Sequence, residues 1–216
     1  MRLKTMKHNI KVSKTAQYYT LGNLQKPKTI WFVLHGYGYS AEYFIKKFEP
    51  ILNEDTLVVA PEGLSKFYLN GVNGRVGASW MTKIDREEEI NDYINYLNQL
   101  YHSIVKDDSH IKINIVGFSQ GGATASRWVA NRKVKCDNFI LWASFFPEDM
   151  KIKSVPNNTN AFVLYGDDDE YITEEWAKKH EQIIKASNIN CQLRKFKGKH
   201  DIPAEMLKEN SLTYNW

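Results

Sequence analysis

The chain has little of what marks several classes of protein. Its two cysteines, Cys136 and Cys191, lie far apart and lack the CxxC spacing of a zinc or redox site, so we expect two reduced thiols that pack in the interior. No apolar run approaches the roughly 18 residues that a membrane span requires, and the N-terminus lacks the apolar core of a signal peptide. We therefore expect a cytoplasmic protein without stable membrane insertion.

The chain also has little excess charge, because 29 basic residues stand against 25 acidic ones and leave a net charge of +4. Such a balance is too mild to indicate nucleic acid as a partner. No G-x-G-x-x-G follows an early strand, which excludes a dinucleotide-binding oxidoreductase. Composition says nothing of the oligomeric state.

What is present predicts a single α/β domain over residues 1–216, since buried-strand runs alternate with helical periods and 43% of the residues are hydrophobic. The first two predicted strands are expected to pair as an antiparallel edge of a mostly parallel sheet, and residues 62–81 to form a long surface loop. The predicted strands are 9–13, 16–21, 29–36, 56–61, 111–118, 139–144, 161–166 and 191–198. The predicted helices are 41–52, 86–105, 120–132, 173–187 and 203–211.

A short segment between a predicted strand and a predicted helix matches a known sequence motif. Between the predicted strand 111–118 and the helix that follows, Gly117, Ser119 and Gly121 match G-x-S-x-G, the nucleophile elbow. Glycines are needed because the turn is so tight that a Cβ on either side would collide with neighbouring chain. The pattern predicts a nucleophilic serine at the carboxyl edge of the sheet, where the N-terminus of a helix favours developing negative charge.

A serine nucleophile needs a base and a group that orients the base, and after such an elbow the order along the chain is acid, then histidine. Only His180 and His200 follow Ser119. His180 falls within a predicted helix and is interpreted as structural, which leaves His200 as the general base. The acid is expected in the run 167–170, where four carboxylates follow a strand, and periodicity does not choose among them. One short run offers too few converging oxygens for a cation, so no metal and no other cofactor is expected.

Acyl transfer also needs hydrogen-bond donors for the oxyanion. The backbone amide of Gln120, directly after the nucleophile, is one candidate. The amide of Tyr37, which lies between two glycines after the predicted strand 29–36, is the other. His35 in the same loop is expected to hold the loop by hydrogen bonds rather than to act in the chemistry.

Apolar side chains at loops and strand ends could form a substrate pocket, although each one is as consistent with an ordinary core position. The candidates are Tyr39, Trp80, Met81, Trp142, Phe145, Phe146 and Tyr171.

These pieces resemble the phospholipase/carboxylesterase branch of the α/β-hydrolases, which includes the acyl-protein thioesterases. The segments "LHGYG", "APEG", "GFSQGGA", "YGDDDEYI" and "FKGKH" carry the resemblance. It implies an α/β-hydrolase fold: a mostly parallel twisted sheet with an antiparallel N-terminal edge, helices on both faces and no separate cap domain. It also implies that Asp169 is the acid. The chain departs from the thioesterases after "HG", where it has Tyr37, Gly38 and Tyr39, and over residues 62–81.

We therefore expect a serine hydrolase that cleaves small-molecule carboxylic esters, or thioesters, through an acyl-enzyme formed by Ser119, His200 and Asp169. Two alternatives stay open. One is a thioesterase or lysophospholipase with long-chain acyl substrates, and the other is a ligand-binding scaffold of the same fold without catalysis.

Overall fold

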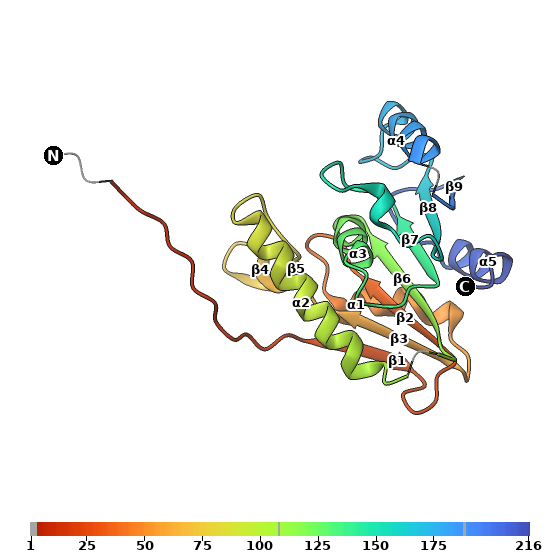
Figure 1. Cartoon of the computed structure of the whole chain (residues 1–216), viewed down its shortest axis with the longest axis horizontal. Helices are drawn as coiled ribbons and strands as arrows, with labels where there is room; N and C mark the ends of the chain where they lie inside the picture. Colours follow the sequence, from red (N-terminus) through yellow and green to blue (C-terminus); the bar gives the residue numbers. More distant parts are fainter. Residues whose placement is uncertain (1–3, 108, 188) are drawn as a thin grey trace.

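The computed structural model describes residues 4–107, 109–187 and 189–216 of the chain. A seven-stranded sheet in the order β1-β3-β2-β6-β7-β8-β9 forms its centre, and β4 and β5 form a separate two-stranded sheet (Figure 1). The strands are β1 (Tyr18–Gly22), β2 (Thr29–Leu34), β3 (Thr56–Pro61), β4 (Ser65–Asn70), β5 (Asn73–Ser79), β6 (Lys112–Phe118), β7 (Asn138–Trp142), β8 (Asn160–Gly166) and β9 (Cys191–Phe196). The α-helices are α1 (Ala41–Phe44), α2 (Arg86–Ile104), α3 (Gln120–Ala130), α4 (Glu174–Ser187) and α5 (Ala204–Thr213), and two short 3-10 helices are η1 (Ile45–Ile51) and η2 (Ile152–Ser154).

The six strands from β2 to β9 that belong to the main sheet run parallel, and β1 joins β3 antiparallel at one edge. All six were expected from the sequence, and the inner ones read as continuous apolar runs because parallel strands inside a sheet are covered on both faces. β3, for example, is buried at every position. The prediction of a mostly parallel sheet with an antiparallel N-terminal edge is confirmed.

Two apolar cores lie on the two faces of the sheet, because successive residues of a strand point to opposite faces. In β2, Phe32 belongs to the core beneath α2, α3 and α4, whereas Trp31 belongs to the core beneath α1, η1 and α5. On α2, Tyr93 and Leu97 are fully buried against the sheet. Helices therefore cover both faces, as predicted.

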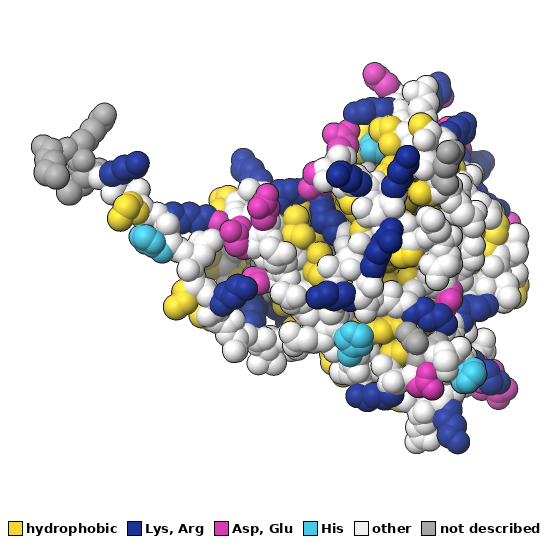
Figure 2. Space-filling view, in the orientation of Figure 1, with side chains coloured by type: hydrophobic (Ala, Val, Ile, Leu, Met, Phe, Trp, Pro, Cys, Tyr) yellow, Lys and Arg dark blue, Asp and Glu magenta, His cyan; other side chains and the backbone are white. Residues whose placement is uncertain are grey.

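The predicted strand at residues 9–13 is wrong. The described residues before β1, 4–17, have no regular secondary structure, and Ile10 and Val12 are 87% and 79% exposed. Figures 1 and 2 show this segment leading away from the body of the protein, which it contacts through the Lys7 side chain on Asp85 and the Lys14 side chain on the Leu64 carbonyl. An alternating pattern indicates extended backbone, but a strand also needs a partner. The antiparallel partner of β1 is β3, not this segment.

The predicted surface loop at residues 62–81 is also wrong, because it contains the β4–β5 hairpin. Gly74 and Gly77 lie within β5, where glycine is normally depleted, so the residues do not read as a strand. The predicted helix at 41–52 is divided: α1 gives way to η1, which contains Pro50. Proline cannot donate the hydrogen bond that a continuing α-helix needs.

Both cysteines are free thiols, as expected, and burial raises the pKa of each. Among the described residues, no helix is both long enough and apolar enough to cross a bilayer.

Candidate active site

Ser119 occupies a strained turn between β6 and α3. Its φ of 52° and ψ of −119° lie in a region that residues with a side chain seldom adopt, and such strain concentrates at functional sites. The Ser119 amide donates to the carbonyl of Trp142 at 3.0 Å, which ties the turn to the end of β7. The backbone is thus held in an unfavourable conformation by its surroundings.

The flanking glycines are required by close approach of the backbone, as the sequence pattern predicts. A Cβ on Gly117 would lie 2.5 Å from the carbonyl oxygen of Gly121. A Cβ on Gly121 would lie 2.2 Å from the carbonyl oxygen of Leu34 in β2. Any side chain at either position would push α3 away from the sheet.

Asp169, which is buried, and His200, which is partly exposed, form a pair on the two loops that follow β8 and β9. His200 Nδ1 lies 2.8 Å from Oδ2 and 3.0 Å from Oδ1 of Asp169, and the Asp169 side chain is fully buried. Because a carboxylate only accepts, Nδ1 carries the hydrogen and Nε2 is left to accept a proton. The amide of Tyr171 donates to Asp169 Oδ1 at 2.9 Å and fixes the carboxylate.

The other carboxylates of the acidic run do not share this role. Asp167, Asp168 and Glu170 are exposed. Asp167 Oδ1 accepts from the Gly198 amide at 2.9 Å, so it supports the loop that carries His200. Asp169 is thus the member of the run whose carboxylate contacts the His200 imidazole.

His200 lies beside the elbow. Its ring centroid is 5.0 Å from that of Phe118, the residue before Ser119, and 4.6 Å from that of Tyr171. Ser119 and His200 are both described residues, and no hydrogen bond joins the Ser119 hydroxyl to the His200 imidazole in this structure. The arrangement nevertheless collects the predicted serine, histidine and aspartate at the carboxyl edge of the sheet.

The loop after β2 touches the elbow directly. Gly36 to Tyr39 form a turn closed by the Tyr39 amide, and Gly38 has a φ of 75°, as the third residue of a type II turn requires. A Cβ on Gly36 would lie 3.2 Å from Ser119 Cβ. Within the described chain, neither the Tyr37 amide nor the Gln120 amide donates to a protein acceptor. Both predicted oxyanion donors are therefore available beside Ser119.

His35 holds this loop, as expected. Nδ1 donates to the Gly36 carbonyl at 2.7 Å, and Nε2 accepts from the Gly63 amide at 2.9 Å. Burial lowers the pKa of His35 to about 4 and outweighs the opposing effect of the hydrogen bond to Gly36. The ring is therefore neutral near pH 7 and has a structural role.

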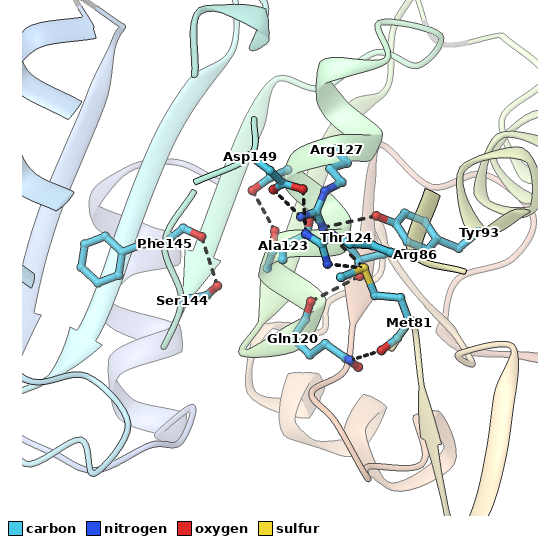
Figure 3. Close-up of polar contacts among 12 residues, drawn as sticks. Met81, Arg86, Tyr93, Gln120, Ala123, Thr124, Arg127, Ser144, Phe145 and Asp149 are labelled. Atoms are coloured by element: carbon cyan, nitrogen blue, oxygen red, sulfur yellow. Dashed lines mark hydrogen bonds and ion pairs between the residues drawn. The ribbon is translucent and has the colours of Figure 1, made fainter. Parts of the chain in front are cut away.

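The Gln120 side chain makes contacts that the sequence did not reveal. Oε1 accepts from the Trp80 amide at 3.1 Å, and Nε2 donates to the Met81 carbonyl at 2.9 Å and the Ser79 hydroxyl at 3.1 Å. Figure 3 shows this link between α3 and the segment after β5. The sequence signal, a glutamine beside the nucleophile, predicted only its backbone amide.

An ion cluster lies behind Met81. Asp149 accepts from Arg127 and Arg86 at 2.7 Å each, and both guanidinium groups contact the Met81 sulfur, as Figure 3 shows. Partial burial opposes ionisation of Asp149, but these hydrogen bonds and charges outweigh it and hold its pKa below the ordinary value. The Met81 segment is thus held between Gln120 and the arginines.

Four of the predicted pocket residues lie in the hydrophobic cores. The structure buries them in the cores with at most 3% of each side chain exposed, so they do not line an open pocket. These residues are Trp80, Trp142, Phe145 and Phe146. Two of them satisfy their indole N–H internally, Trp80 on the His35 carbonyl and Trp142 on the Asp201 carbonyl.

Three predicted pocket residues retain exposed surface at the site: Tyr39, Met81 and Tyr171. Tyr171 is 70% exposed although its ring lies against His200. His180, interpreted as structural, is 2% exposed and packs between Phe145 and Trp176.

A cavity of about 740 Å³ lies elsewhere, between α4 and β9. Its lining includes Cys191, the first residue of β9, whereas Ser119 follows the last residue of β6. In a parallel sheet these are opposite edges, so this cavity is not part of the site.

Comparison with known proteins identifies a family and similar folds. A family model described as Phospholipase/Carboxylesterase matches residues 22–212. No curated protein matches the sequence. Among solved structures, acyl-protein thioesterase 2 of Zea mays is similar with a TM-score of 0.71 and 16% identity, covering 93% of this chain and 99% of that one.

Two bacterial structures are similar to this chain as well. The carboxylesterase of Bacillus cereus has a TM-score of 0.66 and 15% identity, covering 93% of each chain. A phospholipase/carboxylesterase of Dyadobacter fermentans has a TM-score of 0.66 and 17% identity, covering 96% of this chain and 100% of that one. At such identities the likeness concerns the fold, and it confirms the predicted α/β-hydrolase architecture.

Proposed function

Since the chain belongs to the phospholipase/carboxylesterase family of hydrolases, we propose that it is a serine esterase that cleaves small-molecule carboxylic esters through an acyl-enzyme. The observation that carries the proposal is the contact between the buried Asp169 carboxylate and the partly exposed His200 imidazole, beside a strained Ser119. A hydroxyl is a weak nucleophile at neutral pH, and such a pair supplies the base that it needs.

In the first half of the reaction, Ser119 Oγ attacks the ester carbonyl carbon and its proton passes to His200 Nε2. Asp169 keeps the imidazole in the required tautomer and stabilises the imidazolium. The amides of Tyr37 and Gln120 donate to the carbonyl oxygen as it becomes an oxyanion. The carbon–oxygen bond to the alcohol then breaks, and the proton on Nε2 moves to the leaving alkoxide.

In the second half, His200 Nε2 takes a proton from water as the oxygen of that water attacks the acyl carbon. The tetrahedral intermediate collapses, the proton returns to Ser119 Oγ, and the carboxylic acid leaves. All of these steps use groups of this chain and water.

The same geometry serves a thioester, in which a thiolate leaves in place of the alkoxide. The maize neighbour is called an acyl-protein thioesterase, and the Bacillus cereus neighbour a carboxylesterase. We favour esters with modest acyl groups, because four of the apolar side chains expected to receive an acyl chain are core residues. Free thiols are consistent with the cytoplasmic location that we assign to this activity.

The deciding experiment is labelling with a fluorophosphonate followed by peptide mass spectrometry. We expect the label on Ser119, no label on Ser119→Ala, and loss of nearly all p-nitrophenyl ester hydrolysis in Ser119→Ala and in His200→Ala. Hydrolysis that survives Ser119→Ala would favour the non-catalytic scaffold with a contaminating esterase. Esters from acetyl to palmitoyl, assayed beside a palmitoyl-thioester peptide, then separate the short-chain from the long-chain reading.

A further inference from the structure

The β4–β5 hairpin is bonded to the loop that carries the Tyr37 amide. The Gly38 amide donates to the Ala78 carbonyl at 2.9 Å, and the Ala78 amide donates back to the Tyr39 carbonyl at 3.0 Å. Within the described chain, the turn makes three backbone–backbone hydrogen bonds. One closes the turn itself, from Tyr39 to Gly36, and the other two are these bonds to Ala78. The position of the turn therefore depends on β5.

Packing brings the hairpin still closer to the turn. A Cβ on Gly77 would lie 2.3 Å from the Gly38 carbonyl oxygen, so only glycine permits this approach. The Phe67 ring of β4 stacks on the Tyr37 ring with centroids 5.1 Å apart. Both strands of the hairpin thus contact the turn, one through its backbone and the other through a side chain.

The end of the hairpin is tied to the other side of the site. The Gln120 side chain bonds Ser79, Trp80 and Met81, and Gln120 also supplies the second predicted oxyanion amide. The Trp80 indole donates to the His35 carbonyl at 2.8 Å, just before the turn. The residues from 78 to 81 therefore connect the two loops that hold the two amides.

We propose that the β4–β5 hairpin is a brace for the oxyanion hole and that the Gln120 side chain is a positioning residue that joins the brace to the elbow. This inference rests on the proposed function. Oxyanion donors are effective only when they are fixed before the reaction begins, because a donor that must reorganise loses its electrostatic advantage. A shift of about 1 Å at a reacting group can cost on the order of 100-fold in rate.

The brace acts on the transition state and not on the ground state. A carbonyl oxygen of the substrate interacts weakly with the two amides, whereas the oxyanion interacts strongly. Loosening the brace therefore lowers kcat while KM changes little. Loss of folded protein would also lower the apparent kcat, because fewer active sites remain. The folded sites would, however, keep the wild-type affinity for an inhibitor that resembles the oxyanion.

Two substitutions weaken the brace from opposite ends. Gln120→Met removes the polar links to residues 79–81 at nearly constant size and keeps the backbone amide. Gly77→Ala forces Gly38 away from β5. Gly74→Ala is the matched control, because it adds the same methyl group to the same strand at a strained φ of 90° where nothing lies within 4 Å.

We expect Gln120→Met and Gly77→Ala to lower kcat by roughly 10- to 100-fold, with KM within about twofold of wild type. The Ki of a trifluoromethyl ketone, whose serine adduct carries an oxyanion, should rise by the same factor. Gly74→Ala should leave kcat and Ki unchanged even where it lowers the melting temperature.

Wild-type kcat and Ki in Gln120→Met, with Ser119→Ala inactive in the same assay, would overturn the brace and leave the proposed function intact. Activity that survives Ser119→Ala would overturn the proposed function itself. If Gly77→Ala does not fold, Phe67→Ala supplies the second perturbation of the turn, and it should raise Ki in the same proportion as it lowers kcat.

Discussion

Both carboxylate oxygens of Asp169 lie within 3.0 Å of His200 Nδ1, and the carboxylate is sealed from solvent. A buried acceptor in this position fixes both the orientation of the imidazole and the ring nitrogen that carries the hydrogen. Two residues earlier, Asp167 accepts from the Gly198 amide and does not contact the imidazole. The two aspartates can therefore be separated by experiment.

Asp169→Asn should lower kcat for p-nitrophenyl ester hydrolysis by about 10⁴-fold, because the amide favours the wrong tautomer of His200. Asp167→Asn keeps an oxygen that can accept from Gly198 and should stay within about threefold of wild type. Steady-state kinetics on the two purified variants measure both effects. The opposite ranking of the two aspartates would refute the assignment of Asp169.

The Tyr37 amide can be tested apart from its side chain. Tyr37 is the second residue of the turn that Tyr39 closes, a position that favours proline, and proline has no N–H. Tyr37→Pro should therefore lower kcat by about 10²- to 10³-fold in a folded protein. Tyr37→Ala, which loses the same ring but keeps the amide, is the matched control and should be far more active.

Tyr37→Phe should leave kcat within about an order of magnitude of wild type, since the phenol has no part in the proposed reaction. A thousandfold loss in Tyr37→Phe would mean that the hydroxyl takes part in the chemistry. Equal activity of Tyr37→Pro and Tyr37→Ala would exclude the Tyr37 amide as an oxyanion donor.

The strained backbone of Ser119 gives a prediction for stability. A non-glycine residue in this conformation costs roughly 1–3 kcal/mol, and Ser119→Ala keeps that cost whereas Ser119→Gly relieves it. Both variants are expected to be inactive, and the glycine variant should have the higher free energy of unfolding by about 1 kcal/mol. Urea denaturation measures the difference, and a less stable glycine variant would contradict the strain.

The buried His35 makes stability depend on pH. Its pKa is about 4 in the folded protein against an ordinary 6.5, so between these values the unfolded chain binds a proton that the folded chain does not. The contribution of neutral His35 to the free energy of unfolding is fully present above pH 6.5 and decreases as the pH falls toward 4. The loss is about 2 kcal/mol by pH 5 and approaches about 3 kcal/mol near pH 4.

Urea denaturation at pH 7 and pH 5 measures this slope. His35→Gln cannot be protonated, so the difference in unfolding free energy between the two pH values should shrink by about the same amount. Burial lowers the pKa of His180 as well, and a residual slope of the same sign is expected from that residue. An unchanged difference in His35→Gln would show that His35 is not the source.

The sequence predicted the parallel strands and offered the candidate catalytic residues because both depend on local signals. A strand such as β3 is apolar along its whole length, and the glycines around Ser119 are dictated by the turn itself. The order serine, acid, histidine then narrowed the candidates without knowledge of any long-range contact. Asp169 required the family resemblance, since its neighbours in the chain have the same chemistry.

Features that depend on distant partners could not be predicted in this way. The hairpin was missed because Gly77 reads as loop, while the reason for the glycine is Gly38, which lies nearly forty residues earlier in the chain. Trp142 and Phe145 were assigned to a pocket because a large apolar residue at a strand end has the same sequence signature in a core. The Gln120 side chain is informative only once Met81 is known to lie beside it.

The hairpin stands outside the seven-stranded sheet, and its tip is open to solvent, with Val72 86% exposed. Segments with little buried apolar surface open at lower free energy than the core of a domain. On gentle warming, the turnover of substrate should thus decline reversibly while the sheet and its helices remain folded. Heat tolerance of the enzyme and heat tolerance of its scaffold would then be two separate properties, and the first would be set by some fifteen residues between β3 and α2.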